Sequence, residues 1–144
     1  MSIKIPKHVK SSWISSGRLD EKAEEKPWGR EFSWAGFSGI HGKILFISEG
    51  SRTSFKYHKL KTEVLFLQKG SAEVTFGDEF SLCDPIGHPF KTEKMESGQS
   101  LMVQSGCPYR IRALEDCEII EIGNNAADKP VRIEDDYGRV QKDS

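Results

Sequence analysis

Short apolar runs separated by glycines dominate the chain from residue 27 onward. The runs KILFIS (43–48), TEVLFL (62–67) and SAEVTF (71–76) are rich in β-branched and aromatic residues. Runs of this length and composition, bounded by turn residues, are typical of β-strands. No long amphipathic helix pattern alternates with them, which argues against a fold built from βαβ units. The pattern therefore predicts many short strands, arranged as a β-sandwich or a closed barrel.

Two of the runs alternate between apolar and polar residues. In AEVTF (72–76) and in YRIRA (109–113) the first, third and fifth residues are apolar or aromatic, whereas the second and fourth are polar. A period of two predicts antiparallel strands with one buried face. The same alternation turns Arg110 away from Tyr109, which favours a solvated or salt-bridged Arg110.

Two segments lie outside the strand pattern. Residues 1–26 are polar and end in DEKAEEK (20–26), which can form a short helix but lacks an apolar stripe. We expect residues 1–25 to form an N-terminal arm, 26–140 the β domain and 141–144 a tail. The stretch from 78 to 97 contains turn-forming aspartate, proline and glycine residues in succession, which predicts a loop or a distorted hairpin.

Composition narrows the classes of function. A chain of 144 residues predicts one domain, by the usual range of about 100 to 200 residues per domain. The net charge is only -1, so no overall field favours nucleic acid or an anionic membrane as a partner. The three cysteines are widely separated, which fits a reducing setting. No signal-peptide pattern or membrane-spanning run is present, and we expect a cytoplasmic protein.

Glycine-anchored polar residues recur at two places with defined spacing. The first set is Gly50, five residues, Lys56-Tyr57-His58, four residues, Glu63, six residues and Gly70. This spacing resembles the first motif of the cupin family, G-x5-H-x-H-x3-4-E-x6-G, with a lysine in place of the first histidine. The second set is Gly98, Gln104, Gly106, Tyr109 and Ala113. It resembles the second cupin motif in its glycines, but the motif's proline, histidine and asparagine are replaced.

Flanking segments narrow the resemblance. KPWGREFSW (26–34) and VRIEDDYGR (131–139) bracket the two motifs. Together the four segments resemble the C-terminal cupin domain of type II mannose-6-phosphate isomerases, over about residues 26–140. The resemblance implies an all-β fold, a single small antiparallel cupin barrel (a double-stranded β-helix or jelly roll), and a sugar-phosphate theme. In those isomerases the metal positions are Gln, His, Glu and His, which correspond here to Lys56, His58, Glu63 and Tyr109.

The strand pattern suggests how these side chains meet. Positions 56 and 58 point the same way in an extended chain, and a turn at KLKT (59–62) is expected to bring Glu63 back on the neighbouring strand. A lysine ammonium has no free lone pair, and beside a dication it costs several kcal/mol at an effective dielectric of about 20. We therefore expect no cofactor, or a weakly bound divalent transition metal on His58 and Glu63, with the Lys56 ammonium paired with Glu63 in the metal's place.

Two functions remain open. One is a barrel that binds a phosphorylated sugar or a related small metabolite; the alternative is a metal-dependent sugar-phosphate isomerase or epimerase that uses His58 and Glu63. The catalytic candidates are Lys56, Glu63 and His58, and the substrate-binding candidates are Tyr109, Arg132 and Arg139. A polar remnant that merely fills the barrel is a further possibility.

The remaining expectations concern the periphery. Arg132 and Arg139 either line the mouth of the site or hold the C-terminal segment by ion pairs. His8, His41 and His88 have no partner at ligand spacing and are expected on the surface. The arm is expected to cross to a second subunit and form a homodimer, because the edge strands of open sheets are often covered by a partner chain.

Overall fold

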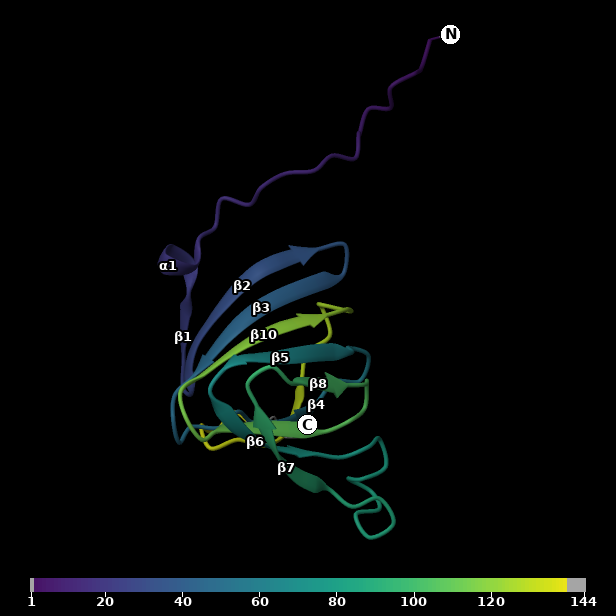
Figure 1. Ribbon diagram of the computed structural model, residues 1–144. Helices are drawn as coiled ribbons and strands as arrows, with labels where there is room; N and C mark the ends of the chain where they lie inside the picture. Colours follow the sequence, from purple (N-terminus) through teal and green to yellow (C-terminus); the bar gives the residue numbers. More distant parts are fainter. Residues whose placement is uncertain (1, 140–144) are drawn as a thin grey trace.

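Two antiparallel sheets face each other and make up almost all of the folded chain (Figure 1). The structure is a computed structural model and describes residues 2–139. The six-stranded sheet contains, in spatial order, β1 (Glu24–Lys26), β2 (Gly29–Phe37), β3 (Ile40–Ile47), β10 (Cys117–Gly123), β5 (Glu63–Lys69) and β8 (Ser100–Val103). The five-stranded sheet contains β11 (Val131–Glu134), β4 (Phe55–Tyr57), β9 (Tyr109–Ala113), β6 (Ser71–Phe76) and β7 (Lys91–Glu96).

The predicted all-β fold is confirmed, in the jelly-roll form with two facing sheets that do not close into a continuous barrel. The runs at 43–48, 62–67 and 71–76 lie in β3, β5 and β6, respectively. Alternation is confirmed in β9, whose first, third and fifth residues are buried. Arg110, on the other face of β9, is also buried. Its guanidinium Nε is satisfied there by a hydrogen bond that it donates to the carbonyl oxygen of Thr53 (3.0 Å).

The core lies between the sheets and consists of apolar side chains from both. Buried members include Leu45, Leu65, Val74, Ile111 and Ile119. Within residues 2–139 no helix is long and apolar enough to cross a membrane.

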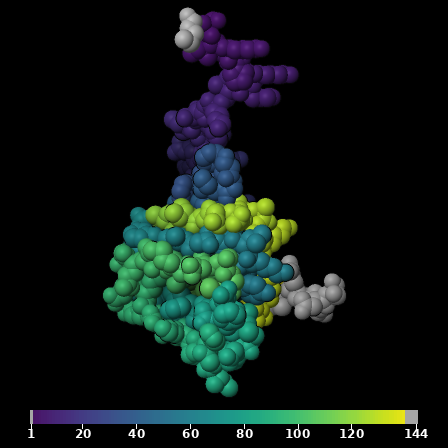
Figure 2. Space-filling model, turned by 90° about the vertical axis from the view of Figure 1, so that its right-hand side faces the viewer, coloured from purple at the N-terminus to yellow at the C-terminus, as the bar shows by residue number. Residues whose placement is uncertain are grey.

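The N-terminal arm stands apart from this core. Residues 2–18 form no helix or strand and extend away from the sheets in both Figure 1 and Figure 2. A single turn of helix follows, α1 (Leu19–Lys22), which covers only the first three residues of the run DEKAEEK considered for a short helix. Next comes β1, which pairs with β2 at the edge of the six-stranded sheet. The expected tail at 141–144 lies outside the described residues.

Of the two forms expected for the stretch from 78 to 97, a loop or a distorted hairpin, the structure has the hairpin. Residues 77–90 form a long connection, but residues 91–96 form β7, which pairs with β6 along its whole length. Together they make a hairpin with a long loop. The sequence gives no signal for this strand, because β7 is an edge strand in which only Met95 is buried, and KTEKME therefore has no apolar face.

The glycines of the two motifs occupy turns with positive φ. Gly50, Gly70, Gly98 and Gly106 have φ values of 83°, 96°, 94° and 82°. Side chains with a Cβ adopt such conformations only with strain. At Gly70, between β5 and β6, an added Cβ would also lie 2.4 Å from the backbone oxygen of Asp116. Gly98 has open space around it.

We therefore expect two alanine substitutions to differ in cost. Gly98→Ala should lower the free energy of unfolding by about 1 to 2 kcal/mol, the cost of a left-handed residue with a Cβ. Gly70→Ala should cost about 3 kcal/mol or more, because the backbone at Asp116 must also move. Urea denaturation measures both values, and an equal cost at the two positions would contradict the close approach at Gly70.

The homodimer remains a prediction, and the arm suggests how it would form. Its apolar side chains Ile3, Ile5, Val9 and Ile14 are exposed, and Trp13 makes an edge contact with Phe37 at 5.4 Å between ring centroids. We expect light scattering to show a dimer for the full chain at micromolar concentration and a monomer after deletion of residues 2–18. A full-length chain that scatters as a monomer would show that the arm does not mediate assembly.

Candidate functional site

A polar cavity of about 180 Å³ opens between the two sheets. Its wall includes every candidate residue identified from the two motifs and the C-terminal segment: Lys56, His58, Glu63, Tyr109, Arg132 and Arg139. The structure thus brings together all six side chains from four separate parts of the sequence.

Glu63 reaches this cavity by a different route from the one expected. The turn at 59–62 does not return the chain to a neighbouring strand; it carries the chain from β4 in one sheet to β5 in the other. The N–H groups of Leu60 and Lys61 donate to the Asp128 carboxylate (2.7 and 3.0 Å), which holds this crossing in place. Lys56 and Glu63 therefore approach the cavity from opposite walls.

The Glu63 carboxylate is the centre of the polar contacts. It is 2% exposed, and its Oε1 accepts a hydrogen bond from the Tyr109 hydroxyl (3.1 Å). The Nε2 atom of His58 lies 3.3 Å from the same oxygen. Burial lowers the pKa of His58 to about 4, although Glu63 opposes the shift, so this imidazole is neutral near pH 7. Burial and the neighbouring carboxylates raise the pKa of Tyr109 well above its usual value.

The expected ion pair between Lys56 and Glu63 is not formed. The Lys56 ammonium instead lies over the ring of Tyr109, 4.8 Å from its centroid. These two residues are register partners on β4 and β9, so their side chains stack on one sheet while Glu63 is held from the other. Burial lowers the pKa of Lys56, and the Glu63 charge only partly offsets this.

Two further residues of the site were missed in the sequence. His41 on β3 is not on the surface: it is 5% exposed, and its Nδ1 lies 3.6 Å from Oε2 of Glu121 on β10. Burial and the Glu63 charge raise the pKa of Glu121 to about 8, whereas burial and Lys61 lower the pKa of His41. A signal was present, since Glu121 falls in phase with the buried Cys117 and Ile119 on the inward face of its strand.

The metal position implied by the cupin resemblance does not fit these side chains. Of its four residues, Lys56 is an ammonium stacked on a ring, and the Tyr109 hydroxyl is a donor to Glu63. Only His58 and Glu63 could serve as ligands there. A second group of donors lies beside it, since one ligand atom each from His41, Glu63 and Glu121 fall within 4.8 Å of one another and could hold a metal ion.

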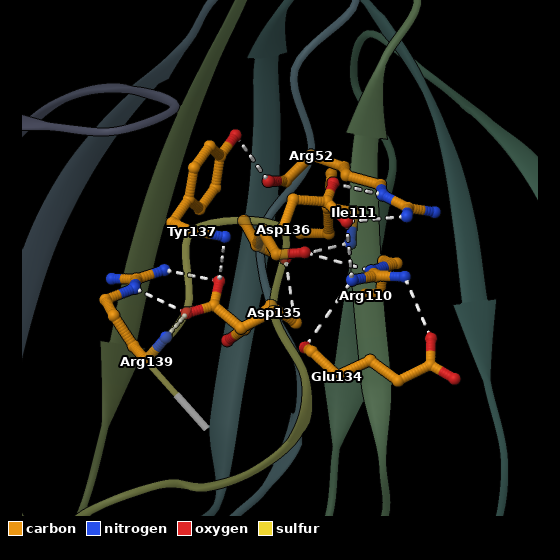
Figure 3. A network of polar contacts seen from close by, with 10 residues as sticks. Arg52, Arg110, Ile111, Glu134, Asp135, Asp136, Tyr137 and Arg139 are labelled. Carbon is orange, nitrogen blue, oxygen red and sulfur yellow. Dashed lines mark hydrogen bonds and ion pairs between the residues drawn. The ribbon is translucent and has the colours of Figure 1, made fainter. Parts of the chain in front are cut away.

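The C-terminal motif is anchored by a network of ion pairs (Figure 3). The Arg139 guanidinium Nε donates to Asp135 (2.8 Å), and Arg52 donates from Nη2 to Asp136 (2.7 Å). Arg110 takes the salt-bridged role and pairs with Glu134 at 3.4 Å. Arg139 therefore combines both of its expected roles, because it also lines the cavity.

Arg132 lines the cavity and keeps one side-chain N–H donor free of partners in the described residues. It lies opposite Lys56 in the pairing of β11 with β4. Its buried Nε atom has no hydrogen-bond partner within residues 2–139. Unlike Arg139, it is thus not held by a carboxylate in this part of the chain.

Comparisons with known structures show the fold. KdgF from Halomonas sp. superposes with a TM-score of 0.61 at 14% identity, over 79% of this chain and 94% of that one. A vicilin from Solanum melongena gives 0.65 at 15% identity, over 81% of this chain and 34% of that one. A variant of oxalate decarboxylase from B. subtilis gives 0.69 at 16% identity, over 89% and 35%.

All three have the cupin fold, and this chain has it too. The chain spans nearly the whole of KdgF but about a third of the other two. A scan against models of protein families found no match, and a search of curated proteins found none either.

The hydrogen bond between Tyr109 and Glu63 can be tested against a second tyrosine. Tyr109→Phe removes a donor from a buried carboxylate and should lower the free energy of unfolding by about 1.5 to 3 kcal/mol. The hydroxyl of Tyr137 donates to the uncharged carbonyl oxygen of Arg52 (3.2 Å) in a half-buried place. Tyr137→Phe should therefore cost about 1 kcal/mol. Urea denaturation gives both values, and a neutral Tyr109→Phe would show that Glu63 does not depend on this donor.

Proposed function

We propose that the cavity binds a small hydroxylated anion of the sugar-phosphate class. The observation that carries this proposal is the charge of the wall. Six cationic side chains line the cavity against three acidic ones. The cations are Lys26, Lys43, Lys56, Lys61, Arg132 and Arg139, and the acids are Glu31, Glu63 and Glu121.

Several of these cations are not neutralised by the protein. Glu31 is occupied by Lys43 (3.1 Å) and Lys26 (3.5 Å). Three other cations, Lys56, Lys61 and Arg132, have no acidic group of residues 2–139 within 4.0 Å. Cations that face a cavity without a counter-ion favour an anionic ligand, because the ligand supplies the missing charge and acceptors.

The size of the cavity limits the ligand. Sites for drug-sized molecules usually measure about 300 to 1,000 Å³. At about 180 Å³, this cavity fits a ligand nearer in size to a monosaccharide than to a nucleotide. The hydroxyl-bearing Thr53 and Ser54 also line it, together with Tyr109. These groups can donate to or accept from sugar hydroxyls.

Proteins of the same fold support an anionic ligand. The vicilin structure is described as containing different anionic ligands in structurally similar pockets, and oxalate decarboxylases act on a small carboxylic anion. The phosphorylated sugar comes from the resemblance of the sequence motifs to mannose-6-phosphate isomerases. The unpaired Lys56 and Arg132 supply the phosphate-binding charge in this proposal.

The alternative is a metal-dependent sugar-phosphate isomerase or epimerase. It is favoured by the contact between His58 and Glu63 (3.3 Å), since a neutral imidazole beside a carboxylate on a cavity wall can move a proton between adjacent carbons of a sugar. In that role Glu63 is the base and Lys56 polarises the carbonyl. Binding is preferred to catalysis, because Lys56 and Tyr109 stand where two of the metal ligands would be.

We expect hexose 6-phosphates to raise the melting temperature of the metal-stripped protein, whereas the neutral hexoses give a much smaller shift. A ligand at about 100 times its Kd stabilises the folded state by about 2.7 kcal/mol. Lys56→Ala should reduce the shift. Lys91→Ala is the matched control, because it removes an exposed lysine on β7, which is outside the cavity wall.

The outcomes separate the possibilities. An equal shift with inorganic phosphate alone would reduce the site to a phosphate site. If no phosphosugar changes the melting temperature at millimolar concentration, the sugar-phosphate proposal is wrong and only the fold stands. If isomerisation of a bound hexose 6-phosphate is detected by NMR, Glu63→Ala should abolish it.

A further inference from the structure

Three neighbouring strands place one donor each at the same point of the six-stranded sheet. Gly123 on β10 pairs with His41 on β3 on one side and with Glu63 on β5 on the other. The three positions therefore form one row across the sheet. Glu121 precedes Gly123 by two residues and so points to the same face. All three donor side chains are at least nine-tenths buried.

A glycine makes room for the imidazole in this row. A Cβ at position 123 would lie 2.3 Å from Nε2 of His41, closer than any side chain can tolerate. The φ of Gly123 is not in the positive range, so backbone conformation does not require a glycine here. What position 123 requires is the absence of a side chain under the His41 ring.

Partners within the protein satisfy this group only in part, because Glu63 accepts a hydrogen bond from Tyr109 whereas His41 has no partner among the described residues. Both ring nitrogens of His41 are buried and have no hydrogen bond within residues 2–139. No lysine or arginine of this part of the chain lies within 4.0 Å of the carboxylates of Glu63 or Glu121; the basic groups within that distance are the imidazoles of His58 and His41, and burial lowers the pKa of both. Buried imidazole nitrogens are normally satisfied, so the two nitrogens of His41 beside two carboxylates point to a ligand for this group.

We propose that His41, Glu63 and Glu121 bind one divalent first-row transition-metal cation. All of its ligands come from the six-stranded sheet, whereas the conventional cupin position lies between the two sheets. Glu63 is the only residue common to both positions. The replacement of motif histidines by Lys56 and Tyr109 thus removes the conventional ligand set and leaves a neighbouring one.

The donor set indicates the class of cation. An imidazole with two carboxylates suits Mn²⁺, Fe²⁺, Co²⁺ or Zn²⁺, whereas Mg²⁺ and Ca²⁺ prefer oxygen alone. Two ligands each about 2.1 Å from one ion are at most about 4.2 Å apart. At the tetrahedral angle of a site with three protein ligands and an open position, the ligands lie about 3.4 Å apart, so the observed spread of up to 4.8 Å requires the side chains to close by about 1.4 Å around the ion.

This site can be tested independently of the proposed sugar-phosphate function, because none of its ligands belongs to the cationic part of the wall. Glu63 and Glu121 line the cavity, so positions not filled by the protein would face it. Three protein ligands with an open position are typical of metal centres that bind a further small ligand.

The experiment uses the full chain without a histidine tag, stripped with EDTA and given Co²⁺, Mn²⁺, Zn²⁺ or Mg²⁺ in turn without any sugar. Elemental analysis after gel filtration should find about one equivalent of Co²⁺, Mn²⁺ or Zn²⁺ per chain and no retained Mg²⁺. The visible absorption of bound Co²⁺ should saturate at the same stoichiometry. Each retained metal should also raise the melting temperature.

The variants identify the ligands. Glu121→Gln keeps the shape of the side chain and should weaken binding by more than the 10- to 100-fold typical of outer-shell changes. His41→Gln and Gly123→Ala should do the same, and the melting temperature without metal shows whether each variant is folded. The control is His88→Gln, which removes an exposed histidine that pairs with Asp78 (2.8 Å) and should leave Co²⁺ binding unchanged.

Three results would overturn the inference. The first is the absence of saturable binding of all three transition metals. The second is binding that survives Glu121→Gln in the folded protein or is lost in His88→Gln. The third is binding that requires His58 but not His41, which would assign the ion to the conventional position. None of these results depends on whether a phosphosugar binds.

Discussion

A single buried carboxylate, that of Glu63, connects the part of the site on the six-stranded sheet with the part on the five-stranded sheet. Glu63 stands at the start of β5 in one sheet, and its Oε1 accepts a hydrogen bond from Tyr109 at the start of β9 in the other. Removing a carboxylate from water costs several kcal/mol unless donors replace the lost hydration. The hydroxyl of Tyr109 is such a donor, and its hydrogen bond joins the two sheets inside the cavity.

The lysine stands apart from the contacts of Glu63. Tyr109 and His58 both approach Oε1 of Glu63, whereas the amino group of Lys56 lies over the face of the Tyr109 ring. Lys56 has no carboxylate within 4.0 Å among the described residues and lines the cavity. The lysine that replaces a motif histidine is thus available to a ligand, and is not one half of a closed ion pair.

The strands and turns could be predicted because their signals are local. Alternation in 72–76 and 109–113 reflects one buried face, and the motif glycines carry the positive φ that their turns require. The crossing at 59–62 could not be predicted, because a four-residue turn looks the same whether it joins neighbours or opposite sheets. It is held by Asp128, more than sixty residues away.

His41 and Glu121 show a second limit of sequence reasoning. His41 shares β3 with Lys43, Glu121 shares β10 with Glu118, and neither belongs to a motif. Their meeting depends on the pairing of β10 with both β3 and β5, which is a property of the sheet order. The strand phase of Glu121 was readable, but its partner was not.

The cavity is divided by charge between its two walls, and this division links the two proposals. The five-stranded sheet contributes Lys56 and Arg132, whereas the six-stranded sheet contributes Glu63 and Glu121. An anion on the first wall and a metal cation on the second would each lower the electrostatic cost of the other, because opposite charges a few ångströms apart in a partly dry cavity attract strongly. With a cation between them, the carboxylates of the second wall add to the attraction that the cations of the first wall already exert on a phosphate.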